Sequence, residues 1–75
     1  MRVEYERSTD QAYIYLREIG AGEAVTQIPI LEDDIHVVLD LDIEGRLIGV
    51  DVMAASQSLP PELLKDAPEP DRPPT

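Results

Sequence analysis

Residues 35–53 read IHVVLDLDIEGRLIGVDVM, and the spacing of their apolar side chains decides the fold. The stretch alternates apolar and polar residues twice, which is the two-residue period of half-buried strands. The side chains that share one face are Ile35, Val37, Leu39, Leu41, Ile43, Ile48, Val50 and Val52. Gly45 marks the turn, because glycine readily adopts the positive φ of a two-residue hairpin. We predict a hairpin that turns at Glu44-Gly45 and pairs Val37 with Val52, Leu39 with Val50, Leu41 with Ile48 and Ile43 with Arg46.

A second hairpin is predicted at the amino terminus. Apolar residues alternate with charged ones over residues 1–6, and a similar alternation resumes after the polar stretch 7–10, where Asp10 suits a turn. A loop over these four residues pairs Tyr5 with Ala12, Val3 with Ile14 and Met1 with Leu16. This register places the apolar side chains of both strands on the same face.

The remaining segments add an edge strand, a short helix and a tail. Residues 24–30 form a weaker strand, which belongs at a sheet edge because Pro29 lacks a backbone N–H; an acidic turn, residues 31–34, follows it. Residues 54–59 indicate a short turn or helix, and residues 61–65 indicate one or two helical turns. Residues 66–75 are proline-rich and polar, which is typical of disorder. We predict a mainly β, small α+β protein with one domain, residues 1–65, and a disordered Pro-rich acidic tail, residues 66–75.

Composition narrows the function classes. Sixteen acidic residues against six basic ones give a net charge of -10, which repels nucleic acid and anionic membranes. This charge is compatible with a basic protein partner, with a bound cation or with a role in solubility alone. Cysteine is absent, so the small core gains nothing from disulfides, and oligomerisation is the stabilising device we expect. No signal peptide and no run of about 20 apolar residues is recognisable, so we expect a cytoplasmic protein.

Some apolar side chains fall on the face opposite the aliphatic set. An exposed apolar surface of this kind usually marks an interface, so we predict a homo-oligomer, such as a homodimer, that associates through this face. The alternative is that the tyrosines only pack on neighbouring strands. The predicted self-association residues are Tyr13, Tyr15, Val38, Leu47 and Met53.

The acidic residues around Gly45 resemble a calcium loop, in which carboxylates occupy alternate positions before a glycine. That loop connects two helices, whereas both flanks here have the period of strands, so a solvated acidic strand face is the favoured interpretation. Weak metal candidates are Asp40, Asp42 and Asp51. His36 is the single histidine, which disfavours zinc and a catalytic pair; we therefore predict no catalytic residues and no cofactor.

Two segments resemble a small prokaryotic family called domain of unknown function 2283. The first is YERSTDQAYIYL, residues 5–16, and the second is VLDLDIEGRLIGVDVMAAS, residues 38–56. The chain departs from the family pattern at Glu6, Gln11 and Asp51. The resemblance implies a small antiparallel sheet with a short helix, and a suspected role as the antitoxin of a toxin–antitoxin pair.

Together these observations favour a non-catalytic, homo-oligomeric interaction module that binds a basic protein, such as a toxin. The alternative is a small enzyme or a weak divalent-cation-binding protein that uses the strand carboxylates. A third hypothesis is a structural subunit of a larger assembly.

Overall fold

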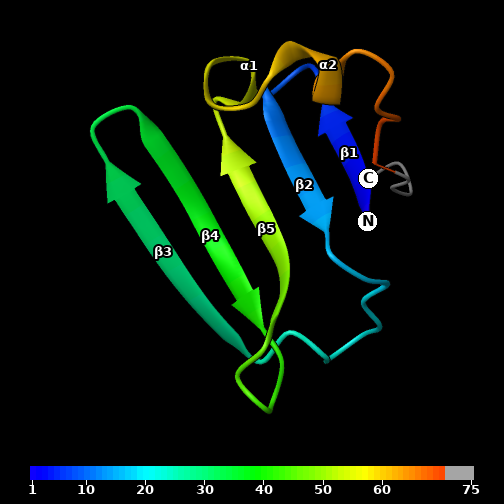
Figure 1. Cartoon of the computed structure of the whole chain (residues 1–75), viewed down its shortest axis with the longest axis vertical. Helices are drawn as coiled ribbons and strands as arrows, with labels where there is room; N and C mark the ends of the chain where they lie inside the picture. The colour runs from blue at the N-terminus through cyan, green and yellow to red at the C-terminus, as the bar shows by residue number, and fades with distance from the viewer. Residues whose placement is uncertain (71–75) are drawn as a thin grey trace.

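A computed structural model describes residues 1–70 as one five-stranded antiparallel sheet with two short helices. The strands lie in the order β1-β2-β5-β4-β3 (Figure 1). Their bounds are β1 (Arg2–Glu6), β2 (Gln11–Tyr15), β3 (Thr26–Glu32), β4 (Ile35–Leu41) and β5 (Leu47–Met53). The fold class predicted from the sequence is confirmed, and both expected hairpins are present.

Apolar side chains form two rows that cross one face of the sheet, here called the first face. One row contains Val3, Ile14, Val50, Leu39 and Ile28, and the other contains Tyr5, Ala12, Val52, Val37 and Ile30. Helices α1 (Ala55–Ser58) and α2 (Pro61–Leu64) cover this face beside β1, β2 and β5. Ala55 and Leu64 pack there on Ala12 and Val52. The core therefore occupies only one half of the first face.

The amino-terminal hairpin has the predicted register. Tyr5 lies opposite Ala12 and Val3 opposite Ile14, and the ladder ends at Arg2–Tyr15, one pair short of the predicted Met1–Leu16 pair. Asp10 closes the turn with a φ of 56°, a left-handed conformation that Asp tolerates better than most residues. The turn role predicted for Asp10 therefore agrees with the backbone.

The turn between β4 and β5 differs from the prediction. Val37–Val52 and Leu39–Val50 pair as expected, but a bulge at Asp40/Leu41 places Leu41 opposite Leu47, so the predicted Leu41–Ile48 pair is wrong. The loop spans residues 42–46 and not the predicted two residues, so the predicted Ile43–Arg46 pair is also wrong. Asp42 closes the loop by accepting hydrogen bonds from the backbone N–H groups of Glu44 and Arg46. Gly45 has a φ of 80°, as the turn prediction required. Ile43 is 86% exposed and takes no part in the core.

β3 lies at the sheet edge, as Pro29 indicated. It extends two residues beyond the predicted strand, to Glu32, so the turn into β4 contains only Asp33 and Asp34. All seven residues of β3 are exposed.

Part of the predicted tail lies against the opposite edge. Beyond α2 the chain passes along β1, where the backbone N–H of Tyr5 donates to the carbonyl of Pro68. The Arg7 guanidinium donates to the carbonyls of Leu64 and Ala67 and to the Glu69 carboxylate. Residues 66–70, here called the C-terminal strap, thus contact the domain. Residues 71–75 of the predicted tail lie outside the described residues.

Candidate functional site

The second face of the sheet, opposite the helices, carries the polar and aromatic side chains of the candidate site. One row across it contains Glu4, Tyr13, Asp51, Val38 and Pro29, and the next contains Arg2, Tyr15, Gly49, Asp40 and Gln27. The two-residue period of β1, β2, β4 and β5 brings these residues together. Both tyrosines therefore lie among carboxylates from neighbouring strands.

Tyr13 lies across Gly49 and reaches the strand beyond it. Its hydroxyl donates to Asp40 Oδ2 on β4, although the Cα partner of Tyr13 is Asp51 on β5. Gly49 makes this possible, because a Cβ at that position would approach the Tyr13 ring carbon Cζ to 2.7 Å. Asp40 is only 8% exposed, and its Oδ1 has no hydrogen-bond partner among the described residues. The absence of a side chain at Gly49 thus allows a buried phenol–carboxylate contact.

Tyr15 forms the second phenol–carboxylate pair. Its hydroxyl donates to Glu4 Oε1 at 2.9 Å, and Arg2 pairs with the other oxygen of Glu4. The Arg2 guanidinium carbon lies 3.8 Å from the centroid of the Tyr15 ring, a cation–π geometry. The Tyr13 and Tyr15 rings have centroids 4.6 Å apart and planes tilted by 57°. The two tyrosines and their partners therefore form one connected network.

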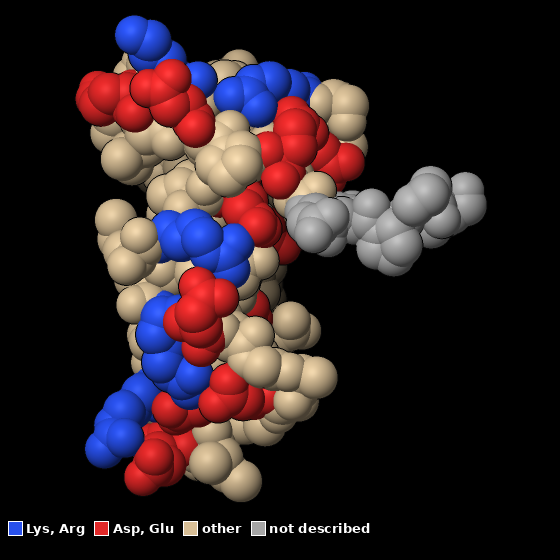
Figure 2. Space-filling view, turned by 90° about the vertical axis from the view of Figure 1, so that its right-hand side faces the viewer, with Lys and Arg blue, Asp and Glu red and all other residues tan. Residues whose placement is uncertain are grey.

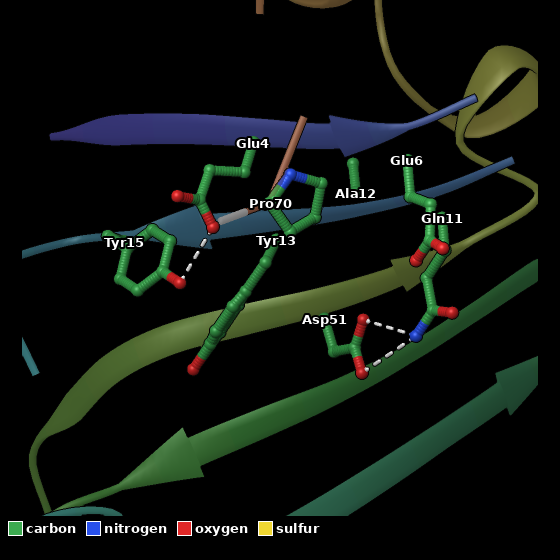
Figure 3. A pocket seen from close by; sticks show the side chains of 8 residues that line it. All are labelled: Glu4, Glu6, Gln11, Ala12, Tyr13, Tyr15, Asp51 and Pro70. Carbon is green, nitrogen blue, oxygen red and sulfur yellow. Dashed lines mark hydrogen bonds between the residues drawn. The ribbon is translucent and has the colours of Figure 1, made fainter. Parts of the chain in front are cut away.

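A groove of about 330 Å³ lies beside this network. Figure 3 shows Glu4 and Tyr15 at one end, Glu6 and Gln11 at the other, and Pro70 above the groove. Gln11 donates to both oxygens of Asp51, at 3.0 and 3.2 Å. The lining residues are Glu4, Glu6, Gln11, Ala12, Tyr13, Tyr15, Asp51 and Pro70.

The protonation of the phenols limits the chemistry of the groove. Burial raises the pKa of Tyr13, and the hydrogen bond to Asp40 raises it further. Burial also raises the pKa of Tyr15, and the hydrogen bond to Glu4 acts in the same direction. Both hydroxyls are therefore neutral donors near pH 7 and poor nucleophiles. The groove offers aromatic rings and carboxylate acceptors, which suit a ligand with N–H donors.

The five predicted self-association residues have different surroundings. Tyr13 and Tyr15 are half-buried in the network, Val38 and Met53 are half-buried on the same face, and Leu47 is 41% exposed beside the β4–β5 loop. Their role in self-association stays a prediction. On the first face, the exposed aliphatic residues of the strands are Ile28, Ile30 and Ile35, on β3 and β4, whereas Leu31 of β3 is 72% exposed on the second face.

The three weak metal candidates have different hydrogen-bond donors. Asp40 accepts from Tyr13, Asp51 accepts from Gln11, and Asp42 accepts backbone N–H groups in its loop. Those backbone hydrogen bonds, that from Arg46 above all, lower the pKa of Asp42. Within residues 1–70, no three His, Cys, Asp or Glu side chains are grouped so that they could hold a metal ion.

A structural cluster that sequence reasoning missed joins the first hairpin to α1. Asp10 accepts hydrogen bonds from the Tyr5 hydroxyl, the Ser56 hydroxyl and the Ser56 backbone N–H, at 2.6, 2.7 and 2.9 Å. Ala54 is the N-cap residue of α1, and its methyl group cannot accept a hydrogen bond, so Asp10 supplies the cap from 44 residues upstream. Tyr5, Asp10 and Ser56 all lie within the segments that carry the family resemblance. That resemblance is the signal in the sequence that could have indicated the cluster.

The fold and these clusters define a class of small antiparallel-sheet proteins that have helices on one face of the sheet and phenol–carboxylate pairs on the other. Residues 2–56 match the family described as Protein of unknown function (DUF2283). The chain belongs to this family, as the resemblance predicted. No curated protein and no solved structure matches it. Within residues 1–70 each helix has four residues, so neither has the length to cross a membrane.

Proposed function

We propose that this protein is a non-catalytic interaction module that binds a basic protein and associates with itself. The observation that carries the proposal is the uncovered half of the first face, here called the open half-face, defined by Ile28, Ile30 and Ile35. Ile28 and Ile30 continue the core rows, Ile35 lies beside them, and none of the three has a helix above it. An apolar surface of this kind usually marks a site of protein contact.

On the first face, burial decreases from β5 to β3. Ala12 and Val52 are fully buried below the helices, Val37 and Leu39 are half-buried, and Ile30 and Ile28 are 37% and 44% exposed. A second layer that covers a sheet completely would bury all of these positions. The fold therefore leaves part of this face uncovered, and the proposed partner would cover it.

Charge supports a basic partner. Each of the four arginines within residues 1–70 already forms an ion pair with a carboxylate of the same chain. Seen from the side of β1, basic and acidic side chains accordingly lie next to one another (Figure 2). The chain nevertheless keeps a net charge of -10, and this charge can attract a basic protein. Complementary charge accelerates association between proteins. The suspected antitoxin role of the family is one such interaction and belongs to the proposal.

Self-association is proposed through the second face. Val38, Met53 and Leu47 give this face its apolar character, and neither described helix lies over it. Light scattering in solution tests this part: we expect twice the 8.3 kDa chain mass, and a monomer for a Val38→Lys variant. A wild-type monomer at all concentrations would end this part of the proposal.

Co-expression tests the main part. The chain is expressed with a tagged product of the adjacent gene and purified through that tag, at low and high salt. We expect a complex that weakens with salt, because screening shortens the range of charge attraction. Failure to co-purify with any basic protein would overturn the proposed function.

A further inference from the structure

The open half-face has the shape and the surroundings to accept one kind of partner. It lies on β3 and β4, away from α1 and α2 (Figure 1). Its side chains Ile28, Ile30 and Ile35 come from two strands that pair over seven residues each. The covered half shows how this sheet is completed: helical segments place small and aliphatic side chains on the apolar rows.

Addition of a strand at either edge is disfavoured. At the β3 edge, Pro29 has no N–H to donate to an added strand. At the β1 edge, the C-terminal strap already takes the N–H of Tyr5 and the guanidinium of Arg7. A partner that presents a face of side chains therefore suits this sheet better than one that adds a strand.

A second copy of the chain is also disfavoured on this surface. Glu32 follows Ile28 and Ile30 on the same side of β3, and Asp33 and Asp34 form the adjacent turn. Two copies face to face would bring these carboxylates together in a dimer of two chains that each carry a net charge of -10. A basic partner would neutralise the same carboxylates.

We propose that the open half-face binds an amphipathic, basic α-helix of the partner protein. The helix would place aliphatic residues on Ile28, Ile30 and Ile35 and basic residues beside Glu32, Asp33 and Asp34. The seven residues of β3 span about 23 Å, which a helix of about 15 residues would cover. The inference rests on the proposed function and names the surface and the partner element that the function requires.

A synthetic peptide tests the inference on the full-length protein. The probe is a fluorescent helical peptide of about 15 residues with leucines on one face and lysines elsewhere. A second peptide has the same composition shuffled so that no apolar face exists, and a third has glutamate in place of every lysine. Binding is followed by fluorescence anisotropy at increasing sodium chloride concentrations, and circular dichroism verifies that each protein variant is folded.

We expect the basic amphipathic peptide to bind and the other two peptides to bind much more weakly. The double variant Ile28→Gln/Ile30→Gln should bind the amphipathic peptide with an affinity lower by ~10-fold or more, because each isoleucine side chain contributes apolar contact area. The matched control is Ile43→Gln, the same substitution at a more exposed isoleucine in the β4–β5 loop (86% exposed), which should leave the affinity unchanged.

Three results would overturn the inference: no binding of the amphipathic peptide, equal binding of the shuffled peptide, or unchanged binding by the double variant. Loss of a dimer in the double variant would assign the surface to a second copy instead. The proposed function is tested separately by co-expression. If the double variant still co-purifies with the basic partner, the module stands and only the location of its site is wrong.

Discussion

Gly49 and Tyr13 form one contact whose tight fit can be tested by adding a single methyl group. In Gly49→Ala the new Cβ would clash with the Tyr13 hydroxyl and Cζ and would lie 3.0 Å from Ile19 Cδ1. Tyr13 cannot move away freely, because its hydroxyl is bound to the buried Asp40. We expect a loss of about 1–3 kcal/mol in the free energy of unfolding, measured with urea.

A double-mutant cycle identifies the cause. With Tyr13→Ala as background, the added methyl group meets no ring, so Gly49→Ala should cost clearly less than in the wild-type chain. Equal costs in both backgrounds would mean that the backbone of β5, and not the tyrosine, requires glycine at this position.

The hydroxyl of Tyr13 should matter more than that of Tyr15. Removing the Tyr13 hydroxyl leaves Asp40 buried without a partner, whereas Glu4 retains Arg2 when the Tyr15 hydroxyl is removed. Tyr13→Phe should therefore lower the free energy of unfolding by about 1.5–3 kcal/mol, and Tyr15→Phe by less. Urea unfolding of both variants decides the order; a larger loss for Tyr15→Phe would contradict the importance of the buried pair.

Asp10 gives the stability a defined pH dependence. Hydrogen bonds from the Ser56 side chain, the Tyr5 hydroxyl and the Ser56 backbone hold the pKa of Asp10 below its usual 3.8. The folded state thus binds its proton less readily than the unfolded state, so the stabilisation is present above pH 3.8 and disappears as the pH falls through the folded pKa. Wild type should exceed Asp10→Asn in stability at pH 7.

The measurement is urea unfolding of both proteins from pH 7 to pH 2.5. The gap between wild type and Asp10→Asn should narrow below pH 3.8, and asparagine is the suitable replacement because it also tolerates the positive φ at this position. A gap that stays constant over the whole pH range would show that the charge of Asp10 has no part in closing the hairpin onto α1.

At the scale of elements, the strands and the first turn were predictable, and the β4–β5 connection was not. Alternation fixes the register of a strand with one buried face, so pairs such as Val3–Ile14 and Leu39–Val50 could be inferred from the sequence. The alternation continues past the end of β4 into Ile43, and nothing in the pattern reveals that Asp42 binds the turn backbone and displaces that residue from the face. Local side chain–backbone contacts decided the turn.

The candidate site was predictable in its residues but not in its contacts. Period two places Tyr13 and Tyr15 on the second face, but the Tyr13–Asp40 contact spans three strands and depends on strand order, which the sequence did not determine. The C-terminal strap is similar. Its contact with β1 depends on Arg7, which lies 60 residues from Ala67 in the sequence.

Arg7 should control the attachment of the C-terminal strap. Its planar guanidinium donates to three carbonyls and one carboxylate of the segment 64–69, a geometry that lysine cannot reproduce. In Arg7→Lys we expect the amide hydrogen of Tyr5, which is bonded to Pro68, to exchange at least several-fold faster than in wild type. Exchange is measured residue by residue with NMR.

The matched control is Arg17→Lys, which changes an ion pair with Glu23 far from the strap. This variant should leave the exchange of Tyr5 unchanged. Unaltered exchange in Arg7→Lys would show that the strap is held by Pro68 and its neighbours alone.

At the scale of the whole molecule, charge opposes compactness. The net charge is -10, and the molecule measures 33 × 32 × 25 Å. The Debye length is about 30 Å at 0.01 M salt and about 8 Å at 0.15 M. At low salt the carboxylates therefore repel one another across the entire domain, whereas at higher salt only neighbours interact. Partner binding by a basic protein would relieve the same repulsion.

Stability should consequently rise with salt. Between 0.01 and 0.15 M sodium chloride at pH 7 we expect the thermal midpoint to increase by several degrees, since ~1 kcal/mol shifts it by ~4–8 °C in a domain of this size. The ion pairs of the four arginines are screened as well, but they are mostly exposed and contribute little. The same titration near pH 4.2, the isoelectric point of the sequence, is the control, because the net repulsion vanishes there and the rise should vanish with it. A midpoint that falls with salt at pH 7 would mean that the intramolecular ion pairs outweigh the acidic excess, and the attraction that we propose for a basic partner would lose its electrostatic basis.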